Sequence, residues 1–203
     1  MDNVTSAMRD MIMEWGRGRI FFLSDFAELN NPGAVRFALM SMARQGYVTR
    51  LARGVYCYPK IEGDDVRRVI IPSAQTIAHA IASREKVRIQ EYGHEAAFRL
   101  GLSGYNRTEL KYLTDGAPRK ITLWDETKIY FNHTDEVKIF SYRNQTMQEL
   151  VSAIRFLGEE LLSEDKRSRI REILRDIPER DFLIDIEIPP AWVGKILLDQ
   201  WER

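Results

Sequence analysis

The chain has little cysteine: Cys57 is the single thiol among 203 residues. One thiol cannot form an internal disulfide or a cysteine-rich zinc site, so secreted disulfide scaffolds are excluded. Long apolar runs are also missing, because no stretch approaches the roughly 18 residues of a membrane-spanning helix. The first residues lack the basic-then-apolar pattern of a secretory signal. These absences predict a globular, cytoplasmic protein with no membrane partner.

Net charge is absent as well, since 30 Lys and Arg balance 30 Asp and Glu. The distribution along the chain is nevertheless uneven. Residues 1–60 carry eight basic and five acidic side chains, and residues 141–203 carry ten and thirteen. From Asn30 to Lys60 there are five basic residues and no acidic one. This segment predicts a phosphate-facing surface, with an ordinary solvated face as the alternative.

The first sixty residues have the periodicity of three short helices. Apolar side chains share one helical face from Val4 to Trp15, and Gly16 with Gly18 ends that helix. An extended piece over 20–22 leads to a second helix that Ser24 is expected to cap. The third helix starts at Asn31 and Pro32, residues typical of a cap and a first turn, and Gly46 closes it. Its inward stripe is Val35, Ala38, Leu39 and Met42.

Two short β runs follow this third helix. They cover residues 47–51 and 55–58 and are joined through 52–54. Three helices followed by a hairpin predict a winged helix-turn-helix DNA-binding domain over residues 1–60. Similar helix–hairpin arrangements also serve as dimerisation modules, so the pattern alone leaves that alternative open.

The rest of the chain predicts a linker over residues 61–72 and a second domain over 73–203. Ser73 is expected to cap a helix, and another helix is expected near 92–100. Four runs with a period of two predict a small, mainly antiparallel sheet: 110–114, 120–124, 128–131 and 137–140. Helical stripes return over 147–161, 163–177 and 190–201. The predicted fold class is therefore α+β, a winged helix followed by a mixed C-terminal domain.

A recognition helix buries one face and offers the other to the major groove of DNA. Arg44 can fork onto a guanine or a phosphate, and Ser41 can bond either. Phe37 or the adjacent Met40 could contact a thymine methyl group, or could pack against a neighbouring helix or a partner subunit. The candidate DNA contacts on this helix are Gly33, Arg36, Phe37, Ser41 and Arg44.

Four further arginines complete the candidate interface. Arg53 lies at the tip of the hairpin beside Gly54, where it can reach a phosphate or the minor groove, and Arg50 would support it. Arg17 and Arg19 are expected to touch phosphates from the loop after the first helix. A surface role in solubility is the alternative for each. Winged helices usually read half-sites, so we expect inverted or paired repeats in double-stranded DNA and a possible homodimer there.

Residues that could carry catalysis form only weak patterns. Glu91, His94 and Glu95 make half of a carboxylate-bridged metal motif, but the sequence has no second copy of it, so a surface histidine in a helix is expected instead. Asp115 and Arg119 flank a turn and predict a salt bridge or turn cap. Cys57 reads as a buried thiol. Phosphate loops, dinucleotide fingerprints and HExxH helices are missing, so we expect neither an enzyme nor a cofactor or metal site.

Several motifs together resemble the AbiEi-type antitoxins of type IV toxin–antitoxin systems. The most specific is the hairpin sequence from Leu51 to Tyr56. The others are Thr76-Ile77-Ala78, Ala96-Ala97, Leu100-Gly101-Leu102-Ser103, Tyr112-Leu113-Thr114-Asp115-Gly116, Arg119 and Ala191-Trp192.

The resemblance implies an abortive-infection, phage-defence module of two genes. The winged helix would repress the module's own promoter, and the C-terminal domain would counteract a toxin that resembles a nucleotidyltransferase, directly or indirectly. Two alternatives stay open on the residues alone. One is a stand-alone winged-helix regulator with a ligand-sensing C-terminal domain, and the other is an interaction protein whose winged helix binds protein.

Overall fold

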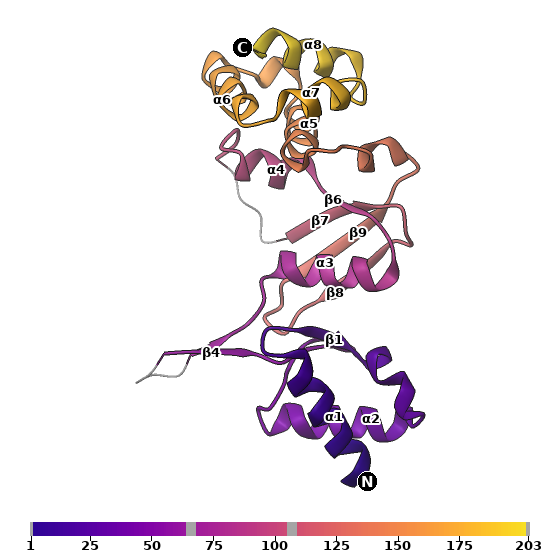
Figure 1. The fold of residues 1–203 in the computed structure, drawn as a ribbon. Helices are drawn as coiled ribbons and strands as arrows, with labels where there is room; N and C mark the ends of the chain where they lie inside the picture. Colours follow the sequence, from indigo (N-terminus) through magenta and orange to yellow (C-terminus); the bar gives the residue numbers. More distant parts are fainter. Residues whose placement is uncertain (1, 64–67, 105–108, 202–203) are drawn as a thin grey trace. The chain divides into compact units, whose positions relative to one another are not determined.

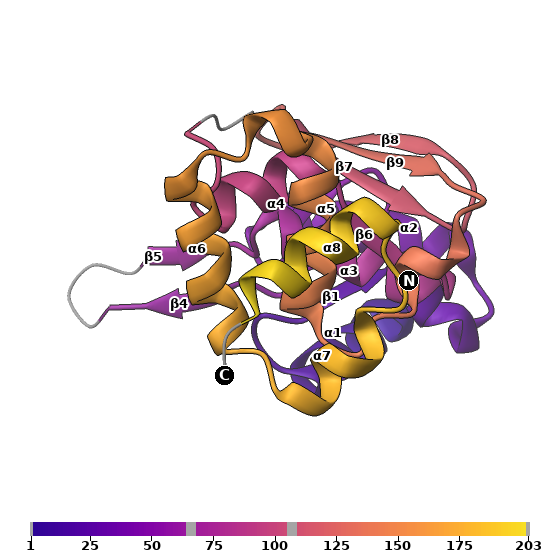
Figure 2. The ribbon, with the colours of Figure 1, turned by 90° about the horizontal axis from the view of Figure 1, so that it is seen from above.

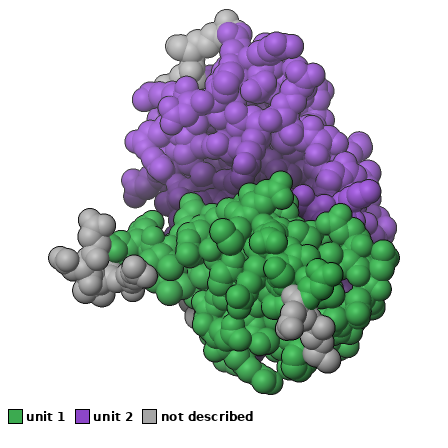
Figure 3. Space-filling model, turned by 60° about the horizontal axis from the view of Figure 1, so that its bottom comes forward, with its two compact units in different colours: residues 1–81, 121–127 green, residues 82–120, 128–203 purple. Residues whose placement is uncertain are grey.

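The computed structural model describes residues 2–63, 68–104 and 109–201. Helices and small sheets alternate along the chain, so the protein is of the α+β class, as the sequence predicts (Figure 1). The chain divides into two compact units, coloured separately in Figure 3. Unit 1 comprises residues 1–81 with 121–127, and unit 2 comprises 82–120 with 128–203. The predicted boundaries of the DNA-binding domain, linker and C-terminal domain stay predictions.

Unit 1 opens with the element order of a winged helix-turn-helix. The elements are α1 (Asp2–Trp15), β1 (Ile20–Phe22), the 3-10 helix η1 (Leu23–Leu29), α2 (Pro32–Arg44), β2 (Thr49–Ala52) and β3 (Val55–Cys57). The strands form one antiparallel sheet in the order β1-β3-β2. The predicted arrangement is confirmed, with one difference at η1. Asp25, and not Ser24, accepts a hydrogen bond from the Phe22 backbone N–H at its start, at 2.9 Å.

Helix α2 forms where its sequence signals predict it. The side chain of Asn31 accepts a hydrogen bond from the Ala34 backbone N–H at 3.1 Å, which satisfies one of the free donors of the first turn. Pro32 occupies that turn without losing a needed donor. Gly46 then adopts a φ of +71°, the left-handed conformation that ends the helix. The four residues of the predicted inward stripe are all buried.

The core of unit 1 joins this stripe to α1, β1 and η1. Met8 and Ile12 of α1 are fully buried against it. Three aromatic rings meet beside them. The ring centroids of Trp15 and Phe26 lie 5.1 Å apart, and those of Phe21 and Phe26 lie 5.7 Å apart in an edge-to-face contact. Burying large rings in this way supplies much of the hydrophobic stabilisation that a small domain needs.

The sheet of unit 1 gains a contact from a distant part of the sequence. The backbone N–H of Trp124 donates to the carbonyl of Leu51 in β2 at 3.0 Å, and Leu123 is buried. The strand predicted over residues 120–124 is shorter in the structure: β8 (Arg119–Thr122) ends two residues before Trp124. The free edge of β2 is thus partly covered, which protects it from pairing with another chain.

Part of the predicted linker is a two-stranded ribbon. Strand β4 (Lys60–Glu62) pairs antiparallel with β5 (Arg68–Ile70), and Ile61 lies opposite Val69. The ribbon extends away from the rest of unit 1 in both views (Figures 1 and 2). All six strand residues are exposed. The sequence reading missed these strands because each is only three residues long.

A four-stranded sheet in the order β6-β7-β9-β8 lies mainly in unit 2. Helix α3 (Ala74–Glu85) precedes it, capped as predicted by Ser73, whose Oγ accepts from the Thr76 N–H at 3.2 Å. The remaining elements are β6 (Ile89–Glu91), α4 (Gly93–Arg99), β7 (Glu109–Thr114) and β9 (Lys128–His133). β6 pairs antiparallel with β7, whereas β7 pairs parallel with β9.

The predicted strand over residues 137–140 is wrong. Val137–Phe140 forms the 3-10 helix η2, in which the Ser141 N–H donates to the Lys138 carbonyl at 3.0 Å. Ile139 alone of its four residues is buried. A four-residue run with one inward side chain fits a single helical turn as well as a strand, so the period could not decide between them.

Helices form the rest of unit 2: α5 (Gln145–Leu157), η3 (Glu159–Leu161), α6 (Glu164–Arg175), α7 (Glu179–Asp185) and α8 (Ala191–Gln200). The stripe predicted through Leu161 stops early, because Gly158 adopts a φ of +75° and ends α5. Leu161 is exposed. Helix α7, which the sequence reading missed, begins directly after Pro178. No helix in the described ranges is long and apolar enough to span a membrane.

Candidate nucleic-acid interface

The outward face of α2 carries the residues that the sequence assigned to DNA. Gly33, Arg36, Phe37 and Arg44 are exposed, and Ser41 is half-buried. Phe37 is 64% exposed and its neighbour Met40 is 45% exposed, so two large apolar side chains stand among the polar ones. The inward stripe of α2 fixes this orientation, because residues on opposite sides of a helix cannot both face the core.

Four of the candidate arginines have free guanidinium groups. Arg19, Arg36, Arg44 and Arg53 are exposed, and within residues 2–63, 68–104 and 109–201 none of them has a side-chain hydrogen bond or an ion pair. An unpaired guanidinium can meet a phosphate or a guanine without breaking an intramolecular bond first. These four side chains therefore present positive charge that is available to a polyanion.

The hairpin of β2 and β3, here called the wing, holds Arg53 at its tip. Arg53 and Gly54 form the two-residue connection, and Gly54 has a φ of +77°, which favours glycine. The register shifts between Arg50 and Ala52, where a bulge interrupts the ladder. The side chain of Arg50 spans this bulge, because its Nε donates a hydrogen bond to the Ala52 carbonyl at 3.3 Å. Arg50 thus braces the wing with one of its donors and keeps the others exposed.

Arg17 is held more tightly than its neighbour Arg19. Its guanidinium donates to the Pro59 carbonyl at 2.9 Å and lies over the ring of Tyr58. The Gly18 backbone N–H donates to the carbonyl of Tyr58 as well, at 2.6 Å. The loop after α1 is therefore fastened to the end of β3, and a phosphate contact by Arg17 would use only its remaining donors.

A short polar network joins α2 to α1 and adds a residue that the sequence reading missed. Ser41 Oγ accepts from Gln45 Nε2 at 3.3 Å, and Gln45 Oε1 accepts from the Arg9 guanidinium at 3.2 Å. Arg9 also lies over the Tyr47 ring, 5.5 Å from its centroid. Arg9 is exposed and so adds a cation beside Ser41. Arg9 precedes Gln45 by 36 residues, and no local signal links them.

The residues considered for catalysis have structural surroundings. His94 is 6% exposed, so the expected surface histidine is wrong. Its Nε2 lies 2.8 Å from Glu95 Oε1. Asp115 and Arg119 do not pair with each other. Asp115 Oδ2 lies 2.7 Å from Arg88 Nε, and Arg119 forms an ion pair with Glu85. Among the described residues, three or more His, Cys, Asp or Glu side chains nowhere gather as a metal-ligand group.

Cys57 is fully buried in β3, as its alternation predicts. Burial raises the pKa of its thiol to about 11, and this outweighs hydrogen bonding with Thr49, which acts in the opposite direction. The nucleophilic thiolate is therefore scarce at neutral pH.

Taken together, these features define an α+β protein with an amino-terminal winged helix-turn-helix and an exposed basic face on it. The chain belongs to DUF6088, a family of unknown function, whose sequence profile matches residues 7–182. The match takes in residues of both units. No curated protein and no solved structure matches the chain.

Proposed function

We propose that this chain is the antitoxin of a bacterial toxin–antitoxin module of the abortive-infection type. It binds its own promoter as a transcriptional autorepressor and counteracts a nucleotidyltransferase-like toxin. It does so without catalysis or cofactor, in the cytoplasm. The motifs shared with AbiEi-type antitoxins, from the wing sequence to Ala191-Trp192, support the proposal. The observation that carries it is the set of unpaired guanidinium groups at Arg36, Arg44 and Arg53 on α2 and the wing.

Helix α2 would enter the major groove as the recognition helix. Arg44 would form two hydrogen bonds to a guanine, while Ser41 bonds a base edge or a phosphate. Phe37 would contact a thymine methyl group. Gly33 would allow a close backbone approach, and Arg36 would meet a phosphate at the flank of the helix.

The wing would follow the neighbouring backbone or minor groove. Arg53 at its tip would contact a phosphate or a narrow minor groove, with Arg50 in support. Arg17 and Arg19 would contact phosphates from the loop after α1. A dimer on inverted or paired repeats would double these contacts. Unit 2, which contains helices α4 to α8, would counteract the toxin either by binding it directly or by an indirect route.

A gel-shift series tests the DNA-binding half of the proposal. Full-length protein is titrated onto the DNA upstream of its own gene and onto a scrambled duplex. Arg44→Ala should lower the preference for the upstream DNA, because it removes a base contact. Arg53→Ala should weaken both duplexes alike, because phosphates carry no sequence information. Arg180→Ala removes an exposed charge from unit 2 and serves as the matched control. Parental binding by both test variants would contradict the proposal.

Coexpression tests the antitoxin half. The partner is the nucleotidyltransferase-like reading frame expected beside this gene. Full-length protein should restore growth to cells that express that toxin. The double variant R44A/R53A should still restore growth while it loses repression of a promoter reporter. Failure of the parental chain to restore growth would contradict the antitoxin role. It would not affect the DNA-binding proposal, which the gel shift tests separately.

A second candidate function is a stand-alone winged-helix regulator whose C-terminal part senses a small molecule. The observation that favours it is a cavity within unit 2, lined by β6, β7, η2 and α5. Promoter binding without any neighbouring toxin gene would favour this regulator over the antitoxin.

A further inference from the structure

The cavity of unit 2 has a volume of about 220 Å³. Leu113, Ile139 and Val151 form apolar parts of its wall, and the rings of Tyr92, Tyr142 and Phe156 add aromatic ones. The volume lies below the roughly 300–1,000 Å³ of pockets that hold drug-sized ligands, so the cavity suits a smaller molecule. An apolar wall with a few converging polar groups is the usual make-up of a small-molecule site.

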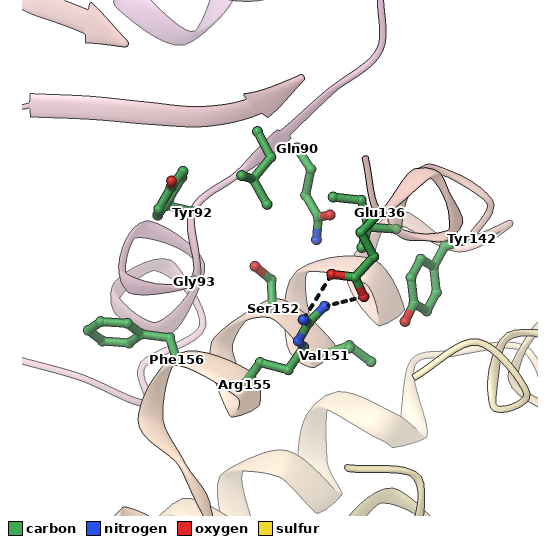
Figure 4. A pocket seen from close by; sticks show the side chains of 11 residues that line it. Gln90, Tyr92, Gly93, Glu136, Tyr142, Val151, Ser152, Arg155 and Phe156 are labelled. Atoms are coloured by element: carbon green, nitrogen blue, oxygen red, sulfur yellow. Dashed lines mark hydrogen bonds and ion pairs between the residues drawn. The ribbon is translucent and has the colours of Figure 1, made fainter. Parts of the chain in front are cut away.

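A bidentate ion pair places a positive and a negative charge on the wall of this cavity. The guanidinium of Arg155 donates to both carboxylate oxygens of Glu136, each at 3.0 Å (Figure 4). The side chains are 37% and 48% exposed. A pair in contact with solvent contributes little to folding, so it can separate at small cost when a ligand supplies new partners. The wall thus offers one cationic and one anionic group at adjacent positions.

Gln90 supplies an unsatisfied acceptor to the cavity wall. Its side chain is 7% exposed, and Nε2 donates to the Gln148 carbonyl at 3.3 Å. Oε1 is buried and has no hydrogen-bond partner in the described part of the chain. Figure 4 shows the carboxamide directed toward the space in front of the Glu136–Arg155 pair. Buried acceptors are normally satisfied, so a donor brought in by a ligand would complete this site.

We propose that this cavity binds a free α-amino acid with an aliphatic side chain. The ligand carboxylate meets Arg155, and its ammonium group lies between Glu136 and Oε1 of Gln90. The aliphatic side chain packs against Leu113, Ile139 and Val151. A zwitterion gives both Glu136 and Arg155 a partner of opposite charge, whereas an ion of one sign gives a partner to only one of them. The inference stands apart from the DNA-binding proposal, because it concerns unit 2 alone and is measured without DNA.

Isothermal titration of the full-length protein with L-leucine, L-isoleucine and L-valine tests the inference. At least one of them should bind saturably. Leucinamide lacks the carboxylate, and N-acetyl-leucine lacks the ammonium group. Each should bind at least about tenfold more weakly than leucine, because a site built for a polar group rejects the analogue without it. These analogues probe the site without altering the protein.

Variants provide a second arm. Arg155→Gln should weaken amino-acid binding at least about tenfold, whereas Arg180→Gln, an exposed arginine of the same unit, should bind as the parent does. Circular dichroism and urea unfolding confirm that each variant is folded. Binding of none of the three amino acids overturns the inference. So does an N-acetyl derivative that binds as tightly as the amino acid found to bind, or an Arg155→Gln variant that is folded and binds as tightly as the parent.

Discussion

The guanidinium of Arg17 lies over the ring of Tyr58, with its central carbon 4.5 Å from the ring centroid. The same group donates to the Pro59 carbonyl at 2.9 Å. Gly16 and Gly18, with φ values of +80° and +91°, turn the chain so that Arg17 reaches the end of β3. Arg19, two residues on, has no such partner in the described ranges. Two arginines with the same assignment in sequence thus differ in what they do for the fold.

Arg17→Ala should lower the free energy of unfolding by about 1 kcal/mol, because it removes a cation–π contact and a hydrogen bond from a charged donor. Arg19→Ala should change it by less than about 0.5 kcal/mol, as is usual for a solvated surface residue. Urea unfolding of both variants measures the difference. Equal stability of the two would show that the Arg17 contacts do not hold the loop.

Asp185→Ala should be among the more damaging substitutions of unit 2. The Asp185 carboxylate is fully buried and accepts the backbone N–H groups of Arg143 and Asn144, each at 2.9 Å. Its removal leaves these two partly buried N–H groups without their acceptor, so we expect a loss of about 2 kcal/mol in unfolding free energy. Asp199→Ala, at an exposed position of α8, is the control and should stay within about 0.5 kcal/mol of the parent. Urea unfolding that ranks the two equally would contradict this account.

Glu95 should make unit 2 less stable as the pH rises. Burial raises the pKa of Glu95 from 4.5 to about 7, against hydrogen bonding to Lys111 and with a smaller contribution from the nearby Glu91 charge. Because the pKa is raised in the folded state, its stabilising contribution is complete below about pH 4.5 and is lost as the pH passes through about 7.

Glu95→Gln keeps the shape of the neutral carboxyl group and removes the titration. The variant should therefore gain stability relative to the parent between pH 5 and pH 8, as measured by urea unfolding at both values. A stability difference between the two proteins that does not change with pH would contradict the raised pKa.

Cys57 should resist thiol reagents in the folded protein. The side chain is fully buried, and its thiol has a pKa of about 11, so both access and thiolate are limiting. Ellman's reagent should react slowly at pH 7.5 and rapidly after unfolding in guanidinium chloride. Fast reaction without denaturant would show that β3 opens readily.

Capping residues, prolines and apolar periodicity predicted the helices in which these local signals agree. Asn31, Pro32 and the stripe through Met42 predicted α2 because a cap, a first-turn proline and a period of 3.6 agree. The ribbon of β4 and β5 was missed because three-residue strands give no usable period. The run at 137–140 became a 3-10 helix because four residues satisfy either geometry. In both failures the segment was too short for its apolar pattern to distinguish one geometry from another.

The candidate interface was predictable to the same extent. Helical periodicity placed Arg44 on the outward face and Arg36 at its flank, and both are exposed in the structure. It could not predict that Arg9 meets Gln45 or that Arg17 meets Tyr58, since both contacts join residues far apart in sequence. His94 was misjudged for the same reason: Phe156 of α5 packs against its ring, and the sequence of α4 does not reveal that neighbour.

The salt dependence of binding to the upstream duplex tests the central claim most directly. Fluorescence anisotropy over a range of salt concentrations gives the slope of log K against log salt. Contacts to four or five phosphates per subunit predict a slope of about −4 for one bound subunit. Arg53→Ala should make this slope shallower by about 1, whereas Arg180→Ala should leave it unchanged. A parental slope near zero, or an identical slope for Arg53→Ala, would contradict the assignment of α2 and the wing to DNA.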